Sequence, residues 1–504
     1  MSVLRTKSIE RTMHDTEHGE HRLKRELSAL DLTVFGVGVI IGTGIFVLTG
    51  EVAKEATGPA VALSFVVAGV VCALAARCYA EFASTVPASG SAYTYSYSTL
   101  GELPAWIIGW DLVLELALGG AVVSVGWSGY FASLMETMGI ELSPTFAGET
   151  ATFNVPAVII ALLLTAVLVA GIKVSSRVNA VIVTVKVAVV LLVIVAGLFF
   201  LKAANFTPFI PESQATNGEE GLAQPVVQAL FGLTPTTFGV LGIFTGAAIV
   251  FFAFIGFDIV ATAAEETKHP QRDMPRGILG SLAVCTALYV AVSLVVVGMQ
   301  KYTELDTAAP LAEAFKAVGQ PALATVITVG ALAGLTTVVM ILMLGQSRVL
   351  FAMSRDGLLP RQLATVHPTF GTPYRITIAV GVVVALMAGF IPLSELAELV
   401  NIGTLFAFVV VAIGVMVLRR TRPDLERAFR TPLVPFVPLA AILACVWLML
   451  NLPLETWLRF AVWMGLGFVL YFAYGRRRSR VGTEGGEEAG MDLRQPTAGA
   501  SRSG

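Results

Sequence analysis

The chain has 504 residues, of which 56% are hydrophobic and 13% charged, and its formal net charge is −2. The charged fraction is about half that of a typical soluble domain, so the composition is that of a polytopic membrane protein. A weakly acidic chain without a basic patch argues against nucleic acid as a partner, and the absence of a Walker-type phosphate loop argues against an ATP-driven motor.

Twelve apolar stretches approach the roughly 20 residues that a helix needs to cross a bilayer. We therefore expect an all-α polytopic membrane protein with about twelve membrane-spanning helices. A charged N-tail (1–29) precedes a core of ten spans (30–418), two further spans follow (434–475), and a Gly- and Glu-rich disordered tail (482–504) ends the chain. The stretches cover residues 30–55, 59–84, 101–135, 155–172, 176–202, 239–265, 275–300, 320–352, 374–391, 396–418, 434–451 and 455–475.

The distribution of basic residues predicts the orientation. If the N-terminus is cytoplasmic, 27 of the 33 lysines and arginines fall on the cytoplasmic side, and one, Lys186, lies within a span. By the positive-inside rule this bias places both termini in the cytoplasm, with the protein in the plasma (inner) membrane.

The first stretch contains glycines at positions 36, 38, 42, 44 and 50. Each glycine costs a helix interior roughly 0.5–1 kcal/mol relative to alanine. Isolated glycines in a span often serve tight helix packing. The dense cluster Gly42-Thr43-Gly44 instead predicts a broken helix, and a break within a bilayer must face protein or a cavity.

A second interruption is expected in the sixth stretch, at Phe251–Asp258, which contains Gly256. The two interruptions lie five spans apart, and an odd number of spans gives them opposite orientations in the membrane. Paired interruptions of this kind indicate the binding site of a transporter built from inverted repeats. We expect repeats over about 30–202 and 239–418, with two appended spans.

The two breaks present complementary groups. The second half of span one directs N–H groups and a positive dipole end at a carboxylate, whereas the first half of span six directs carbonyl oxygens at an ammonium group. Together they predict a site for a zwitterionic α-amino acid, with the span-six phenylalanines forming either a lid or ordinary packing. The expected binding residues at the breaks are Ile40, Ile41, Gly42, Thr43, Gly44, Phe252, Ala253, Phe254, Ile255 and Asp258, and Phe252 is also expected to gate the site.

Ionisable residues within spans are costly and usually face a pathway. Lys186 lies about ten residues into span five, hence about 15 Å deep. It is expected either to carry the coupling proton or to act as a fixed ammonium bonded to carbonyls of a broken helix. Glu115 is expected to line the pocket, Asp111 to be structural, and Asp258 either to bind or to cap the inner half-helix.

Glu265 and Glu266, followed by basic residues, are interpreted as an inner ionic gate, with surface charge pairing as the alternative. The sequence has no nucleophile elbow and no HExxH or Cys/His metal spacing, so we expect neither an enzyme nor a metal or other cofactor.

Taken together, these segments resemble the amino acid–polyamine–organocation superfamily, and within it the bacterial relatives of the cationic amino acid transporters. The resemblance covers roughly residues 25–475. It rests on Gly38–Phe46, on Pro87–Tyr93 through Gly109-Trp110, on Phe254–Asp258 with Ala263–Glu266, on Ser347–Pro360, and on Phe429–Pro438.

The resemblance implies a LeuT-like fold that works by alternating access. It also implies a substrate carboxylate bound at Thr43 and Gly44 and a substrate amine bound at the carbonyls of Phe252, Ala253 and Ile255. A lysine matching Lys186 takes the place of a sodium ion in proton-coupled relatives.

Substrate choice is not decided by the resemblance. Met343 lies in the bulky apolar run Met340–Leu344 of the eighth stretch, which favours a neutral amino acid such as alanine, whereas Glu115 could serve a cationic one. The leading expectation is proton-coupled import of neutral L-amino acids. The alternatives are an exchanger of cationic amino acids or polyamines with the same fold, and a sensor that binds an amino acid without moving it.

Overall fold

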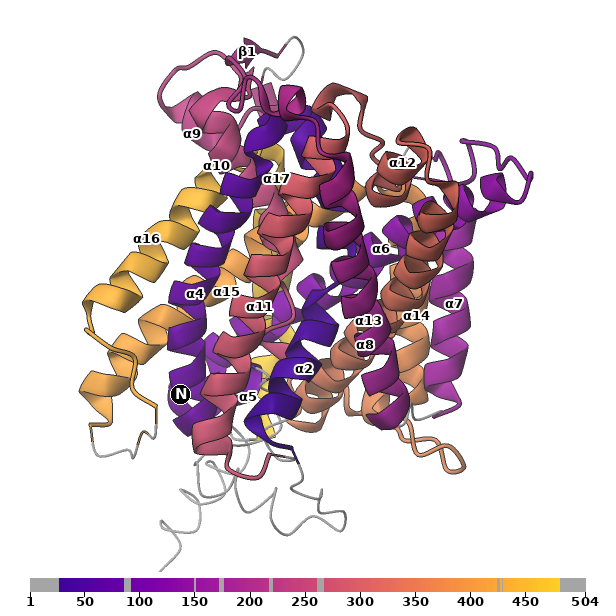
Figure 1. Cartoon of the computed structure of the whole chain (residues 1–504). Helices are drawn as coiled ribbons and strands as arrows, with labels where there is room; N and C mark the ends of the chain where they lie inside the picture. Colours follow the sequence, from indigo (N-terminus) through magenta and orange to yellow (C-terminus); the bar gives the residue numbers. More distant parts are fainter. Residues whose placement is uncertain are drawn as a thin grey trace, which may run out of the picture.

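The computed structural model describes residues 27–85, 92–148, 151–171, 176–216, 221–260, 267–423, 427 and 429–480. The described part is mostly helical, and its helices form one bundle (Figure 1). A two-stranded antiparallel sheet, β1 (Gln214–Ala215) with β2 (Thr236–Thr237), lies in the loop at the upper end of this view. The N-tail to residue 26, the C-tail and the Glu265–Glu266 gate lie outside the described residues.

Seven helical segments of the described chain are long and apolar enough to cross a membrane. Five shorter apolar helices accompany them, and together they fall on the twelve stretches expected from the sequence. Two of the short ones, α2 (Ala29–Ile40) and α10 (Gly239–Val250), are short because each is interrupted. The chain is a multi-pass membrane protein, and the number of its crossings stays a prediction.

The remaining helices follow in chain order. They are α3 (Thr49–Val52), α4 (Val61–Thr85), α5 (Ala92–Thr99), α6 (Glu102–Thr137), α7 (Val155–Val169), α8 (Ser176–Gly197), α9 (Val226–Leu230), α11 (Pro270–Met299), α12 (Pro310–Ala317), α13 (Pro321–Arg355), α14 (Tyr374–Phe390), α15 (Leu393–Thr421), α16 (Phe436–Leu450), α17 (Leu454–Leu470) and α18 (Arg476–Arg478).

Local sequence explains where several helices begin. Ser28 caps α2 with a capping box in which its side chain accepts from the Asp31 N–H while Asp31 bonds back to Ser28. Proline stands in the first turn of α7, α11, α12 and α13, where its missing N–H costs nothing.

Helix α6 lies at the centre of the bundle. In its most apolar stretch of 18 residues, 94% are buried. It packs against α13, α15, α14, α5 and α7, and elsewhere α4 packs on α11 and α7 on α14. The segment Leu454–Arg478 lies at the edge of the bundle. Only 22% of its most apolar stretch of 18 residues is buried. Large apolar side chains on its surface, such as Val462 and Val469, are exposed and suit contact with lipid.

Candidate substrate and coupling site

The first interruption separates α2 from the second half of its span. Helix α2 ends at Ile40, Ile41 is extended (φ −70°, ψ 97°), and a π-helical turn begins at Gly44. The side chains of Ile41 and Thr43 are fully buried. The Thr43 hydroxyl has no hydrogen-bond partner among the described residues, and a buried polar group left in this way calls for a functional explanation.

The second interruption follows α10. A 3₁₀ turn, Phe251–Phe254, continues the helix, after which Ile255 is extended (φ −61°, ψ 137°) and Gly256 has φ +112°. A side chain at Gly256 would be strained, and its Cβ would lie 2.7 Å from Val39 Cγ1. Glycine at 256 therefore allows both the turn of the chain and its close approach to span one.

The two interruptions meet inside the bundle. A Cβ placed on Gly44 would lie 2.2 Å from the Cβ and 2.3 Å from the Cα of Ala253. Only glycine permits this approach of the two backbones. The break in span one and the break in span six thus face each other, as the pattern of two interrupted spans predicts.

Lys186 reaches the first break from α8. Its Nζ donates to the carbonyl of Gly38 at 2.8 Å and to that of Ile41 at 3.4 Å. These carbonyls lie at the C-terminal end of a half-helix, where the dipole is negative and favours a cation. The side chain is 1% exposed, and its stem lies against Gly334 of α13. This contact is the one expected of a fixed ammonium bonded to carbonyls of a broken helix. Whether Lys186 also carries the coupling proton stays a prediction.

Tyr289 of α11 joins the two breaks, and sequence reasoning missed it. Its hydroxyl lies 2.7 Å from the carbonyl of Ile40 in span one and 2.7 Å from that of Ala253 in span six. A hydroxyl carries a single proton, so it donates to only one of these carbonyls at a time. No motif in the sequence marks this residue.

The span-six phenylalanines divide into different environments. Phe254 packs in an aromatic group with Phe65 and Tyr289, which is core packing. Phe252 is 6% exposed and lies in the 3₁₀ turn at the break. Its role as a gate stays a prediction.

Three acidic side chains lie near the second break. Glu115 of α6 interacts electrostatically with Asp258 and with Asp111. All three are buried. Both Asp111 oxygens lack a hydrogen-bond partner among the described residues, so this residue, expected to be structural, is a buried carboxylate without a bonded cation there.

Met343 is fully buried on α13, and its Cγ would lie 3.7 Å from a Cβ on Gly120 of α6. The structure therefore places this sequence-predicted residue in the α6–α13 interface. Whether it also contacts a substrate stays a prediction.

Comparison of the sequence with known proteins identifies its family. Residues 27–471 match the model of the amino acid permease family. The chain belongs to this family, within the amino acid–polyamine–organocation superfamily.

Relatives span nearly the whole permease. It is 48% identical to the methylthioribose transporter of Bacillus subtilis (strain 168) over 462 residues, covering 91% of this chain and 95% of that protein. It is also 48% identical to the branched-chain amino acid permease BcaP of the same organism over 488 residues, covering 95% of this chain and 99% of that protein. The vacuolar cationic amino acid transporter 4 of Arabidopsis thaliana is 39% identical to it over 427 residues, covering 84% of this chain and 68% of that protein. Family and relatives indicate a transporter rather than an enzyme.

A second residue missed from the sequence supports the end of α10 in this permease. Asn401 of α15 is fully buried, and its amide donates to the carbonyls of Ala248 and Ile249 at 2.8 and 3.0 Å. Carbonyls in the last turn of a helix lack intrahelical partners when the helix stops. An isolated asparagine in an apolar helix was the available signal.

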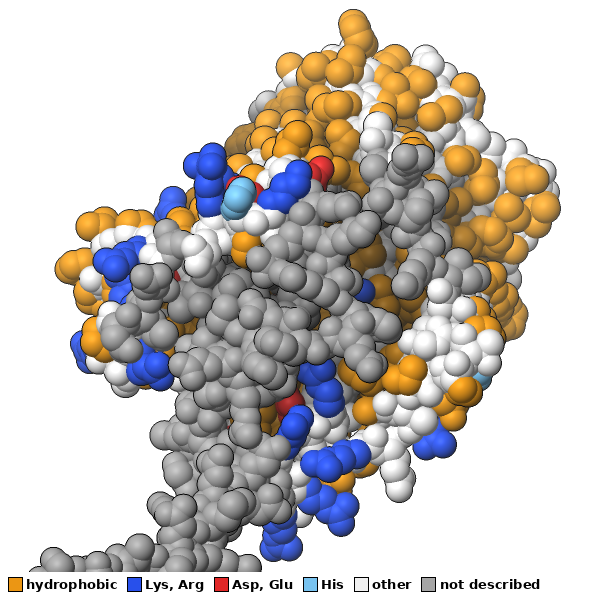
Figure 2. All heavy atoms as spheres, turned by 90° about the horizontal axis from the view of Figure 1, so that it is seen from below, with side chains coloured by type: hydrophobic (Ala, Val, Ile, Leu, Met, Phe, Trp, Pro, Cys, Tyr) orange, Lys and Arg blue, Asp and Glu red, His pale blue; other side chains and the backbone are white. Residues whose placement is uncertain are grey.

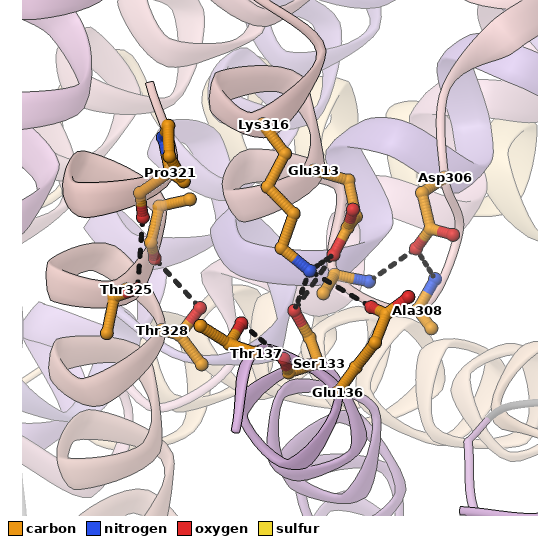
Figure 3. Close-up of polar contacts among 12 residues, drawn as sticks. Ser133, Glu136, Thr137, Asp306, Ala308, Glu313, Lys316, Pro321, Thr325 and Thr328 are labelled. Atoms are coloured by element: carbon orange, nitrogen blue, oxygen red, sulfur yellow. Dashed lines mark hydrogen bonds and ion pairs between the residues drawn. The ribbon is translucent and has the colours of Figure 1, made fainter. Parts of the chain in front are cut away.

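At the upper end of the bundle, α12 is tied to the end of α6 (Figure 3). Lys316 pairs with Glu313 at 2.7 Å and with Glu136 at 3.1 Å, and donates to the Ser133 hydroxyl at 3.1 Å. Partial burial lowers the pKa of Lys316, but its bonds to Glu313 and Glu136 outweigh this and hold the pKa above the ordinary 10.5. A raised lysine pKa stabilises the fold below the unfolded value, so this contact is present throughout the neutral range and is lost only as pH rises through the higher folded pKa.

Proposed function

We propose that this permease is a proton-coupled symporter that imports neutral L-amino acids by alternating access. The observation that carries the proposal is the meeting of two interrupted helices with the Lys186 ammonium bonded to carbonyls of the first break. Interrupted spans at corresponding positions of two repeats are the usual place for substrate and coupling ion.

The helix packing supports a five-plus-five inverted repeat. Counting the interrupted helices as spans one and six, α4 packs on α11, α6 on α13 and α7 on α14. Each pair joins a span to the span five places later. This is the relation expected if two repeats of opposite orientation pack around a shared axis. The repeats, the two appended helices and the cytoplasmic placement of both termini in the inner membrane are part of the proposal.

In the proposed site, the substrate carboxylate binds near Thr43 and Gly44, where the second half of span one begins with a positive dipole end. The substrate ammonium binds carbonyls of the span-six break. A carbonyl oxygen has two lone pairs, so the Ala253 carbonyl can accept from the ammonium even while it accepts from the Tyr289 hydroxyl. Lys186 releases and regains its proton during the cycle, since a buried amine loses charge more readily than an exposed one.

The name of one relative supports a neutral amino acid, whereas another relative of equal identity is named for methylthioribose. BcaP is named for branched-chain amino acids and matches along nearly its whole length. The plant relatives are named for cationic amino acids, which keeps that substrate class as the second candidate, with Glu115 as the carboxylate that would receive the side chain.

The test is uptake into proteoliposomes with and without an inward proton gradient, using labelled alanine, leucine and arginine in parallel. We expect gradient-driven accumulation of the neutral amino acids in the wild type and its loss in Lys186→Ala. Lys202→Ala, which removes an exposed lysine outside the site, is the matched control and should accumulate substrate normally.

Accumulation that ignores the gradient and survives in Lys186→Ala would overturn proton coupling and indicate an exchanger. Arginine entry stimulated by arginine inside, without alanine or leucine uptake, would overturn the neutral assignment. Binding without uptake or exchange would indicate a sensor.

A further inference from the structure

Lys186 lies apart from the basic residues at the protein surface. Figure 2, which shows the bundle from below, has lysine and arginine side chains gathered in several groups on this lower end. Only 1% of the Lys186 side chain is exposed, and it reaches the first break from α8 inside the bundle. An ammonium group within a membrane protein needs fixed acceptors. The residues that hold its stem therefore decide which acceptors it meets.

The stem of Lys186 lies against the bare backbone of a glycine in α13. A Cβ on Gly334 would lie 3.0 Å from Lys186 Cγ, 3.1 Å from Cε and 3.4 Å from Cδ. Non-bonded carbon atoms prefer a separation of about 3.5–4.0 Å. A side chain at this position of α13 would therefore press on three consecutive carbons of the lysine and displace the stem.

The same face of α13 also contacts the first break. Val338 follows Gly334 by four residues, and residues four apart lie on one face of a helix. A Cβ on Gly42 would lie 3.5 Å from Val338 Cγ1, so this side chain packs beside the break. Helix α13 thus contacts both the lysine and the broken segment whose carbonyls the lysine binds.

The ammonium end of Lys186 is enclosed by groups of two other helices. From α2 and the break, the carbonyls of Gly38 and Ile41 accept from Nζ at 2.8 and 3.4 Å. From α11, the Cys285 thiol interacts electrostatically with Lys186, and Tyr289 bonds to another carbonyl of the break. The bond to Ile41 is already long against the usual range of about 2.7–3.2 Å. A shift of the stem by a few tenths of an ångström would remove it.

We propose that Gly334 is a positioning residue for proton coupling, because its bare backbone lets the Lys186 ammonium reach the carbonyls of the first break. This inference rests on the proposed coupling role of Lys186 and deepens it. The stem lies against α13 while the ammonium is bonded to the end of α2 and the break. A change in the relative position of α2 and α13 therefore moves the ammonium off its acceptors, which ties proton release to the conformational change.

The test compares alanine variants at two glycines of α13 in proteoliposomes. Gly334→Ala presses on Lys186, whereas Gly330→Ala presses on Val189 of the same helix α8, whose Cγ2 would lie 2.3 Å from the new Cβ. Two rates are measured for each variant. One is accumulation of labelled leucine driven by an inward proton gradient, and the other is exchange of labelled for unlabelled leucine without a gradient.

We expect Gly334→Ala to lower accumulation relative to exchange by about tenfold or more, the loss typical of removing a hydrogen bond to a charged group. Gly330→Ala is the control for lost packing and should lower both rates together, so that their ratio stays that of the wild type. An unchanged ratio in Gly334→Ala, beside gradient-driven accumulation in the wild type, would overturn the inference alone. A wild type that ignores the gradient would overturn proton coupling and this role of Gly334 with it.

Thermal unfolding of a double variant tests the contact itself, and it serves if Gly334→Ala alone does not fold. Lys186→Ala removes the three stem carbons that the new Cβ would meet, so adding Gly334→Ala in that background should cost no further stability. In the wild-type background the same change should lower the unfolding temperature or prevent folding. An equal loss in both backgrounds, or a double variant that does not fold where Lys186→Ala does, would overturn the inference.

Discussion

At the scale of single residues, the site depends on side chains that satisfy backbone carbonyls freed by the helix breaks. Lys186, Tyr289 and Asn401 each donate to such carbonyls from a different helix. In a bilayer no water is available for this role, so each unpaired carbonyl would cost several kcal/mol at the ~2–7 kcal/mol scale of polar-group burial. The polar residues that bond to these carbonyls therefore stabilise the breaks, and they mark the position of the site as clearly as the breaks do.

Tyr289→Phe should lower transport strongly while leaving a folded protein. The substitution removes the hydroxyl between the Ile40 and Ala253 carbonyls and keeps the ring that packs against Phe254. We expect a stability loss of about 1 kcal/mol, the net contribution of one buried hydrogen bond. We also expect transport to fall by about fivefold or more, because the hydroxyl holds both breaks. Uptake and thermal unfolding measured on the same preparation check the prediction.

Tyr97→Phe is the control, since its hydroxyl bonds to Glu102 and Ser479 at the lower end of the bundle. It should lose comparable stability without the same loss of transport. If both variants lost transport equally, the effect would be general and not a property of the breaks.

At the scale of elements, the two interrupted helices act as one unit. Gly44 and Gly256 let the interrupted segments approach each other more closely than side chains allow, and both would clash if replaced. Thr43 and Ala253, next to these contacts, are buried. A change at this crossing should affect both halves of the site at once.

Gly44→Ala should abolish transport and destabilise the fold. The new Cβ would lie 2.2 Å from Ala253 Cβ and 2.3 Å from its Cα, and the backbone atom cannot move aside cheaply. Overpacking of this kind costs typically about 1–3 kcal/mol. Uptake assays and thermal unfolding measure the two effects.

Gly465→Ala provides the matched comparison, because nothing lies within 4 Å of a Cβ at that position of α17. Alanine there should be neutral or slightly stabilising, since it improves helix propensity by up to about 1 kcal/mol. Full activity in Gly44→Ala would contradict the close crossing of the two breaks.

At the scale of the whole molecule, a buried ion pair joins parts of the chain that lie far apart in sequence. Glu81 of α4 is 2% exposed and accepts two hydrogen bonds from Arg419 at the end of α15, at 2.9 and 2.7 Å. It also accepts from the Thr431 N–H at 2.7 Å, and Arg427 lies 3.5 Å away. One carboxylate thus fastens α4, α15 and the segment leading to α16.

Glu81→Gln should be among the more destabilising single changes in the protein. It removes the anion that Arg419 and Arg427 both contact, and breaking a buried pair costs about 3–5 kcal/mol. Glu395→Gln, which removes one partner of the exposed pair with Arg459, should cost at most about 1 kcal/mol. Thermal unfolding of the two variants beside the wild type checks the contrast. Equal unfolding temperatures would show that the Glu81 network does not hold the bundle together.

Sequence reasoning reached the helices and the breaks because both are local. The length of each apolar stretch sets where a helix can span, and the glycines at 42, 44 and 256 permit backbone that leaves the helix, so α2 and α10 end close to where the pattern predicted. The depth expected for Lys186 rests in the same way on its place in its stretch, and it stays a prediction. These properties depend on residues near one another in the chain.

Tertiary structure alone decided what meets at the breaks. That Tyr289 lies between Ile40 and Ala253, and that Asn401 caps α10, depends on how helices far apart in sequence pack. Tyrosine and asparagine occur singly in many spans and loops, so the sequence around them does not indicate which residues they contact. Packing brings them together because each buried polar group must find a partner in a medium without water.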